Sequence, residues 1–223
     1  MSLFSPRMDI LPPAQREIWP LLRPGVELGL VLYGGTAVAL RLGHRESVDF
    51  DFFTDKQLSQ EQLRRSYPFL NSSTTIQSEP DTLSVLVPVR GETVKLSFLG
   101  SITIGRVGIP ERTPDGVLEV ASSLDLLATK LKVLLQRVEA KDYQDIAAIL
   151  RSGQPLELGL AAAAELYAPT FQPSEAVKAL TYFEGGDVAK LSDRDKSLLI
   201  RAVSGLRRVP MLGRTSRSLS SQS

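Results

Sequence analysis

One short stretch constrains the fold of this chain more than any other: SVDFDFFTD, residues 47–55. Acidic and aromatic residues alternate along it. Because successive side chains of a strand point to opposite faces, Asp49 and Asp51 share one face while Phe50 and Phe52 share the other. Such a strand fits a sheet that buries one face in a core and keeps two carboxylates together on the other.

The neighbouring segments extend this sheet. ELGLVLYGG, from Glu27, is apolar and ends in a glycine pair, which predicts a buried strand running into a tight turn. TAVALRL then supplies helix formers, with Thr36 as the expected N-cap. A short helical stretch, AQREIWPLL, precedes this region. A further helix is expected at 59–69, and strands at 73–78, 82–89 and 93–99.

The character of the chain changes after Pro114. Residues 122–151 contain no Gly or Pro and have leucines at helical spacing, which predicts one long helix or two joined near Glu139. Further helices are expected at 156–167, 174–183 and 192–206. The predicted fold class is α+β, a mixed sheet with flanking helices followed by a helical half. The predicted domains are 1–115 for the sheet-containing core, 116–206 for the helices and 207–223 for a tail.

Composition narrows the possible chemistry. The chain has no Cys and one His, so Cys-ligated metals, thiolate nucleophiles and His-rich metal sites are excluded. The N-terminal residues lack a signal pattern, and no apolar run approaches the roughly 20 residues needed to span a bilayer, so we expect a cytoplasmic protein without membrane contact. The tail carries four arginines and no acid, which predicts disorder, or alternatively an arm that helps hold RNA.

Two features indicate phosphate chemistry. Two carboxylates at i and i+2 on a strand can share Mg²⁺, which commonly completes its shell with water and substrate phosphates. The backbone amides of Gly34 and Gly35 have no side chains in the way and suit a nucleoside triphosphate. Each signal alone is weak, because Asp-x-Asp and Gly-Gly occur often by chance. There is no Walker A sequence and no GxGxxG after a strand.

The order of the signals is more specific. GGTAVALRLGHRESVDFDFFTD resembles the nucleotidyltransferase toxins of the abortive-infection and type IV toxin–antitoxin group, within the polymerase β-like superfamily. ASSLDLLATKLKVLLQRVEAKDYQDIAAIL is similar to the helical Lys…Lys/Arg-Asp-x-x-Asp segment of that group. The resemblance implies a nucleotidyltransferase fold. It also implies Mg²⁺-dependent transfer of a nucleotide from an NTP to an acceptor hydroxyl, with RNA or tRNA as the acceptor class and an antitoxin protein as a partner.

The resemblance also implies roles for individual residues. Asp49 and Asp51 would ligate Mg²⁺, and Asp142 would complete the catalytic set as the candidate base. The residues implied for nucleotide binding are Gly34, Gly35, Thr36, Ser47, Lys130 and Lys141. If the helix is continuous, Lys130, Arg137 and Lys141 lie on one face, a cationic stripe that suits a triphosphate or an RNA backbone. The alternative is a solvated helix face with internal Lys–Asp pairs.

One position departs from the family pattern. The superfamily usually has a third carboxylate on a later strand beside the acid pair, and the matching position here is Ser97. Two consequences are open. The site binds Mg²⁺ weakly and transfers slowly, or Lys95 replaces the cation and leaves a module that binds without catalysis. A less favoured third hypothesis is a metal-dependent phosphotransferase that acts on a protein hydroxyl.

Overall fold

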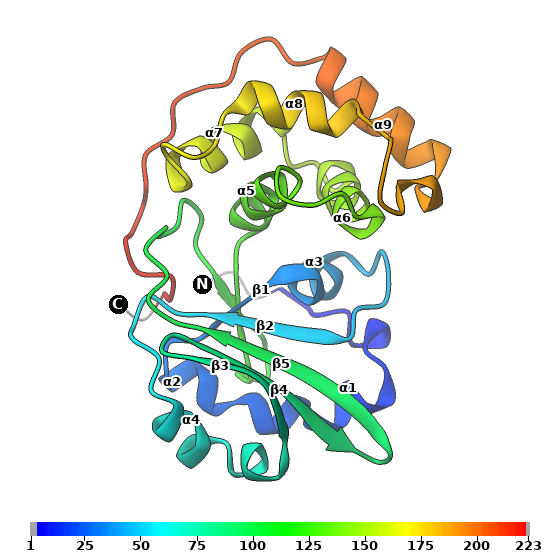
Figure 1. Cartoon of the computed structure of the whole chain (residues 1–223). Helices are drawn as coiled ribbons and strands as arrows, with labels where there is room; N and C mark the ends of the chain where they lie inside the picture. The colour runs from blue at the N-terminus through cyan, green and yellow to red at the C-terminus, as the bar shows by residue number, and fades with distance from the viewer. Residues whose placement is uncertain (1–3, 222–223) are drawn as a thin grey trace. The chain divides into compact units, whose positions relative to one another are not determined.

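The computed structural model describes residues 4–221. Within them the chain divides into two compact units (Figure 1). The sheet unit comprises residues 4–105, 109–122 and 216–221, and the helical unit comprises residues 106–108 and 123–215. The chain therefore passes between the units more than once, so the sheet unit is assembled from segments that are far apart in the sequence.

The sheet unit is built on one mixed sheet. In spatial order its strands are β3 (Thr74–Glu79), β4 (Thr82–Val89), β5 (Glu92–Leu99), β2 (Asp49–Phe53), β1 (Val31–Tyr33), β7 (Glu119–Val120) and β6 (Glu111–Arg112). The pairs β2–β5 and β1–β7 are parallel, and the other neighbours are antiparallel. The predicted α+β class and mixed sheet are confirmed.

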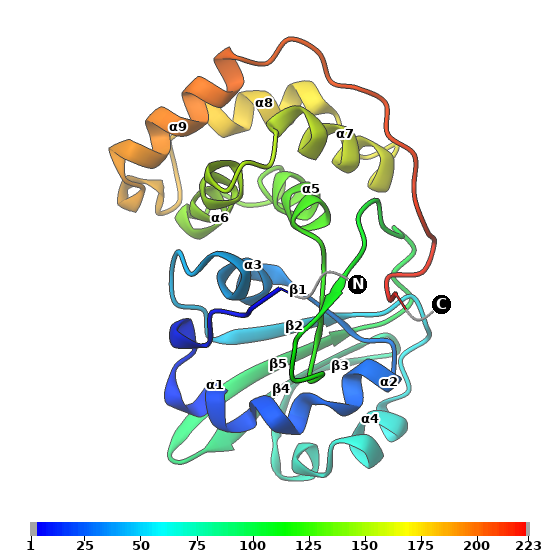
Figure 2. The same cartoon turned by 180° about the vertical axis from the view of Figure 1, so that it is seen from behind.

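Helices lie on both sides of this sheet (Figures 1 and 2). One side carries α1 (Pro13–Ile18), α2 (Pro24–Glu27) and α4 (Gln60–Ser66), and the other carries α3 (Gly34–Leu42). Short 3₁₀ turns occupy Met8–Ile10, Trp19–Leu22 and Pro68–Ser72.

The aromatic face of β2 forms part of the core. Phe50 and Phe52 are completely buried, and Phe52 stacks on Phe98 of β5. Trp19 packs on Phe50, and Tyr67 packs on Phe98. Burying these rings drives the strand to the core because each removes a large apolar area from water. The predicted division of the strand into an aromatic face and an acidic face is confirmed.

The turn region between β1 and α3 differs from the prediction in two ways. Glu27 ends α2 instead of opening a strand, so β1 is confined to Val31–Tyr33. The helix begins at Gly34 with Tyr33 at the N-cap position, so Thr36 is not the cap. Thr36 lies inside the first turn, where its hydroxyl donates to the Asp49 carbonyl of β2, and the start of α3 has no side-chain cap.

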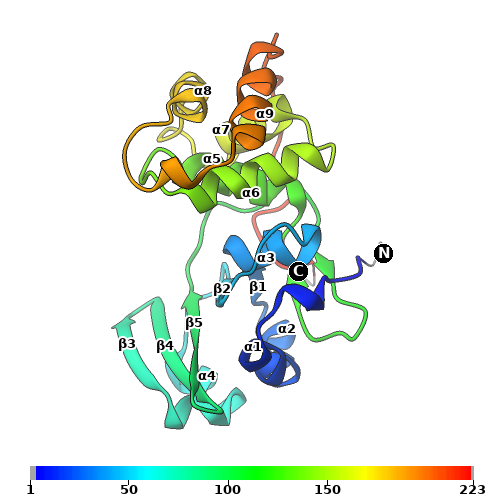
Figure 3. The same cartoon turned by 90° about the vertical axis from the view of Figure 1, so that its right-hand side faces the viewer.

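The helical unit contains α5 (Ser123–Val133), α6 (Ala140–Arg151), α7 (Leu156–Leu166), α8 (Pro173–Thr181) and α9 (Asp193–Ser204), with a 3₁₀ turn at Val188–Lys190 (Figure 3). Helix α5 packs on α6 and α7, α7 packs on α8, α8 packs on α9, and α9 returns to α6. The predicted helices are confirmed, with two helices in place of one long one. None of the helices within residues 4–221 is long and apolar enough to cross a membrane.

The C-terminal segment, residues 216–221, differs from the predicted disordered tail. Asp55 accepts hydrogen bonds from Ser218 Oγ at 3.0 Å and from the Leu219 amide at 2.9 Å. Buried Glu119 accepts them from Ser220 Oγ at 2.7 Å and from the Ser221 amide at 2.9 Å, and Leu219 is fully buried. The segment is ordered because two acids of the sheet unit satisfy its amides and hydroxyls. Strands β6 and β7 lie on either side of residue 115 and pair with each other, so both belong to the sheet unit.

The Glu119 contact gives a first prediction. Ser220→Ala removes the hydroxyl that donates to a carboxylate with only 1% of its surface exposed, so we expect a loss of about 1–3 kcal/mol of stability. Ser221→Ala is the matched control, because Ser221 reaches Glu119 through its backbone amide and keeps that bond. Thermal unfolding of both variants measures the difference. Equal melting temperatures for the two variants would contradict the assignment.

Candidate functional site

The acidic face of β2 carries the two carboxylates predicted to act together. Asp49 and Asp51 are both half-buried and lie on the face opposite the aromatic core. In the parallel register with β5, Asp49 lies opposite Lys95 and Asp51 lies opposite Ser97. The residue beside the acid pair is therefore the serine, as expected from the sequence. Ser97 is buried and supplies a neutral hydroxyl where a third carboxylate would complete the set.

The glycine pair lies directly against this acid pair. Gly34 has a positive φ of 72°, a conformation that side chains rarely adopt, and a Cβ at this position would overlap Asp51 Oδ2. A Cβ at Gly35 would overlap Nη2 of Arg45 and lie 3.3 Å from Ser47 Oγ. Only glycine leaves room for both groups at the start of α3. The glycine turn and the Asp51 carboxylate are therefore in direct contact.

Two hydroxyls connect α3 to β2. Thr36 Oγ1 lies 2.8 Å from Ser47 Oγ and also donates to the carbonyl oxygen of Asp49. Both side chains are buried. Because the Thr36 hydroxyl is already used in this connection, it positions the helix start against the acids. The nucleotide contacts that the resemblance implies for Thr36 and Ser47 stay predictions.

The carboxylate oxygens of Asp49 and Asp51 suit a hard divalent cation that also coordinates oxygens of a substrate. Within residues 4–221 there is no group of three or more His, Cys, Asp or Glu side chains placed to hold a metal ion. Mg²⁺ is often held by one or two carboxylates, with waters and phosphate oxygens filling its other positions. The pair Asp49 and Asp51 matches that pattern. Neither a Zn²⁺ cage nor a Ca²⁺ cage would be served by two carboxylates alone.

The helical unit holds a separate ionic cluster. Lys130 Nζ lies 2.7 Å from Asp142 Oδ1 and 2.6 Å from Asp145 Oδ2. Arg137 Nε donates to Asp142 Oδ2 at 2.8 Å. Both acids are fully buried and Lys130 is nearly so. Buried charges of this kind persist only when they are paired.

The geometry of this cluster contradicts the predicted cationic stripe of Lys130, Arg137 and Lys141. The helix is interrupted between Val133 and Ala140, so Lys130, Arg137 and Lys141 do not form one continuous face. Lys130 and Arg137 converge on Asp142 instead, while Lys141 Nζ lies 2.8 Å from Glu139 Oε2 near the surface. The geometric argument for a shared helix face is therefore wrong. The implied phosphate contacts of Lys130 and Lys141 stay predictions.

Asp142 has a protonation state that bears on its predicted role. Burial by itself raises the pKa of this carboxyl, but the hydrogen bonds from Arg137 and Lys130 outweigh burial and lower the pKa below its ordinary value. A carboxylate with a lowered pKa, held by two cations, is a weak proton acceptor. The arrangement fits a residue that positions Lys130 better than it fits a general base.

Sequence reasoning missed two members of these clusters. Arg45 lies on Gly35, and its signal was its place in the motif GGTAVALRLGHRESVDFDFFTD, between the glycine pair and the acids. Asp145 is the second acid on Lys130, and its signal was the spacing of three between the acids of KDYQD, which places both on one helix face.

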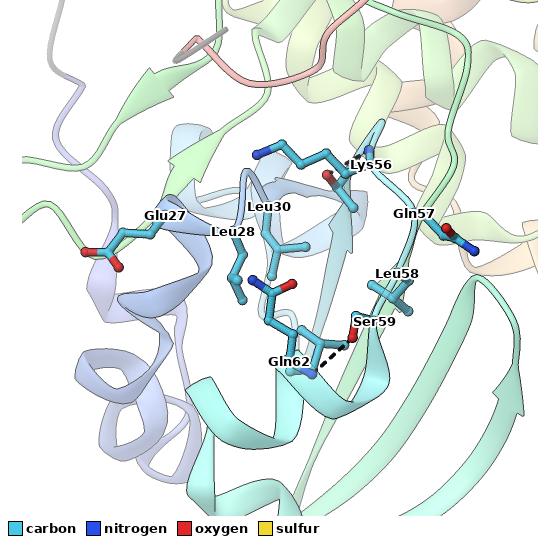
Figure 4. A pocket seen from close by; sticks show the side chains of 10 residues that line it. Glu27, Leu28, Leu30, Lys56, Gln57, Leu58, Ser59 and Gln62 are labelled. Atoms are coloured by element: carbon cyan, nitrogen blue, oxygen red, sulfur yellow. Dashed lines mark hydrogen bonds between the residues drawn. The ribbon is translucent and has the colours of Figure 1, made fainter.

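A small cavity of about 80 Å³ also opens in the sheet unit (Figure 4). Its walls include Glu27, Leu30, Lys56, Ser59 and Gln62. Neither the acid pair nor the glycine turn lines it. The cavity is large enough for a few waters and too small for a nucleotide.

The glycine turn gives a second prediction. Gly34→Ala forces a side chain into a left-handed conformation and displaces the Asp51 carboxylate, so we expect at least a tenfold loss of Mg²⁺-dependent nucleotide binding. Gly91→Ala is a matched control, because Gly91 also has a positive φ but faces open space. Equilibrium binding of a Mg²⁺–NTP complex to both variants measures the effect, and equal losses would assign it to backbone strain alone.

The sequence of the chain is similar to known proteins. A family model described as "Nucleotidyl transferase AbiEii toxin, Type IV TA system" matches residues 21–195, well over half of the chain, including the glycine turn, the acid pair and the KDYQD segment. An uncharacterized protein of Aquifex aeolicus (strain VF5) is 32% identical over 143 residues. That alignment covers 61% of this chain and 66% of the relative, just under two thirds of its length.

Proposed function

Because the chain belongs to the AbiEii family of nucleotidyltransferase toxins of type IV toxin–antitoxin systems, we propose that it transfers a nucleotide from an NTP to an acceptor hydroxyl of RNA, with tRNA included in that class. The observation that carries this proposal is the packing of Asp51 against Gly34. It places a carboxylate that could hold a metal ion directly against the first residue of a helix, whose amides suit phosphate oxygens.

Different residues of the sheet unit would hold the metal ion, bind the phosphates and position the helix start. Asp49 and Asp51 would hold Mg²⁺, and the amides at the start of α3 would donate to the β- and γ-phosphates. Bound Mg²⁺ would supply charge neutralisation of the phosphates and alignment for in-line displacement. The acceptor oxygen forms a bond to the α-phosphorus, the bond from that phosphorus to the bridging oxygen breaks, and pyrophosphate leaves. Thr36 keeps the helix start and the acids in register throughout.

We propose that removal of the proton from the acceptor hydroxyl is the slow step. Ser97 is not an anionic ligand and its hydroxyl is a poor base, so β5 offers no carboxylate opposite Asp51 to take the proton. Asp142 is a weak acceptor for the reason given above. We therefore propose slow transfer in which the proton passes to water.

A second candidate function is binding without catalysis. Lys95 lies opposite Asp49 in the register, so a lysine on the neighbouring strand is a candidate to replace a cation on the acidic face. Turnover discriminates the two functions.

The test uses the whole chain with each of the four NTPs, labelled at the α-phosphate. Each is incubated with Mg²⁺ or with EDTA, and with total RNA or total cell protein. We expect label in the RNA fraction with Mg²⁺ alone. Label in protein would identify nucleotide transfer to a protein hydroxyl, and release of labelled nucleoside diphosphate with unlabelled protein would indicate a phosphotransferase. Triphosphate binding with no label in either fraction and no labelled nucleoside diphosphate would identify the binding module.

The family implies an antitoxin, and we propose that its gene is adjacent to the gene of this chain. Expression of the chain alone should slow growth of the host, and co-expression of the neighbouring gene should restore it. Unchanged growth on expression of the chain alone would contradict the proposed toxicity.

A further inference from the structure

The guanidinium of Arg45 occupies an unusual place. A Cβ built on Gly35 would overlap Arg45 Nη2 and lie 3.4 Å from Cζ, so the guanidinium rests on the second residue of α3. The start of a helix carries a partial positive charge, and cations there are unfavourable. An arginine held at this end of α3 needs negative charge nearby to offset that repulsion.

The surroundings supply part of that charge. Asp51 Oδ2 packs on Gly34, the residue before Gly35, and Asp49 lies two residues away on the same face of β2. Arg45 Nη1 also donates to the carbonyl oxygen of Glu46 at 2.9 Å, which turns the side chain back over the turn. The carboxylate and the guanidinium therefore rest on consecutive residues of the same turn.

The Asp51 carboxylate and the Arg45 guanidinium would interact with a polyphosphate in different ways. A carboxylate repels phosphate unless a cation lies between them, whereas a guanidinium binds phosphate directly through two parallel N–H donors. Arg45 is half-buried, so its contact with an anion is less screened by solvent than that of an exposed arginine. A phosphate chain over Gly35 could contact the guanidinium at one point and the cation held by Asp51 at the next.

We infer that Arg45 binds the phosphate chain of the nucleotide above Gly35 and sets the affinity of the site for polyphosphate. This inference rests on the proposed function, since it assigns a further residue to the same site. The Arg45 contact favours triphosphates over nucleosides and monophosphates, because those ligands lack the phosphates that would reach the guanidinium.

Inorganic tripolyphosphate with Mg²⁺ is a suitable probe, because it needs no base, sugar or acceptor. Arg45→Gln should weaken its binding about 10- to 100-fold, the loss expected for a charge-assisted pair of hydrogen bonds. Arg45→Lys should recover part of the affinity, since lysine keeps the charge and loses the fork. Arg65→Gln is the control, because Arg65 pairs with Glu61 on the exposed surface of α4.

Two further readouts separate binding from a structural role. The salt dependence of tripolyphosphate affinity should be shallower in Arg45→Gln, and the KM for NTP should rise more than kcat falls. If Arg45 only supports the loop before β2, Arg45→Gln will lower the melting temperature and keep the tripolyphosphate affinity, which would overturn the inference. If the wild-type chain transfers no nucleotide and binds neither NTP nor tripolyphosphate, both the proposed function and the inference about Arg45 fail.

Discussion

Asp142→Ala is expected to destabilise the helical unit by about 3–5 kcal/mol, the cost of breaking a buried ion pair by removing one partner. Both oxygens of Asp142 accept from cations, Oδ1 from Lys130 and Oδ2 from Arg137. Alanine leaves the buried Lys130 ammonium with Asp145 alone and opens a cavity in α6. A loss of this size is a large part of the stability of an ordinary domain.

Urea unfolding followed by far-ultraviolet circular dichroism measures this loss. Glu175→Ala is the control, since it breaks an exposed pair with Lys178 that is worth little. Asp142→Asn keeps the volume and removes the charge, so it should fall between the two. If Asp142→Ala costs no more than Glu175→Ala, the cluster does not hold the helical unit together.

The carboxyl of Asp142 also makes the stability of the folded chain depend on pH. Burial raises the pKa of Asp142, but the hydrogen bonds from Arg137 and Lys130 lower it by more. The pKa is therefore lower in the folded chain than in the unfolded chain, where it is about 3.9. The unfolded state therefore takes up its proton first as the pH falls. The stabilisation is complete above the unfolded pKa and is lost as the pH falls toward the folded one. Stability between pH 5 and 3 should decline more steeply in the wild type than in Asp142→Asn, and parallel curves would contradict this.

The largest expected effect on activity comes from the acid pair. Asp51→Asn keeps the shape that fits against Gly34 and removes the negative charge that would hold Mg²⁺. We expect nucleotide transfer to fall by roughly 10²–10³-fold or more, because a preorganised group that stabilises transition-state charge contributes at least that much. Asp49→Asn should behave similarly, because both carboxylates lie on one face of β2.

Initial rates of label incorporation at saturating NTP measure this loss, and thermal unfolding shows whether the fold is kept. Asp193→Asn is a suitable control, since Asp193 is an exposed acid at the start of α9. Wild-type rates in both Asp49→Asn and Asp51→Asn would remove the acid pair from the reaction, and with it the proposed mechanism.

Much of the sheet could be predicted because its signals are local. The alternation in residues 49–53 identified both faces of β2, and that face assignment needs no knowledge of partners. The position of Ser97 followed from the same period applied to β5. The helices of the second half were recognisable from apolar spacing and from the prolines and glycines between them.

The features that the sequence did not reveal depend on distant partners. β6 and β7 are two residues long and have no pattern of their own, so only their pairing with each other and with β1 makes them strands. The start of α3 was misplaced because Thr36 has a favourable capping side chain, yet its hydroxyl is used by β2. The order of the C-terminal segment also depends on distant partners. A polar, arginine-containing stretch gives no sign that Asp55 and Glu119 will accept hydrogen bonds from it.

The return of the chain to the sheet unit has a consequence for synthesis. Glu119 and the serine that donates to it are 101 positions apart, and most of the helical unit lies between them. At about 5–20 residues per second, a ribosome needs on the order of 5–20 s to make that interval. During this time the helical residues emerge while the sheet unit still lacks its final segment. A chain interrupted anywhere in the helical unit therefore leaves Glu119 and Asp55 without these donors, and the half that carries the acid pair is completed last.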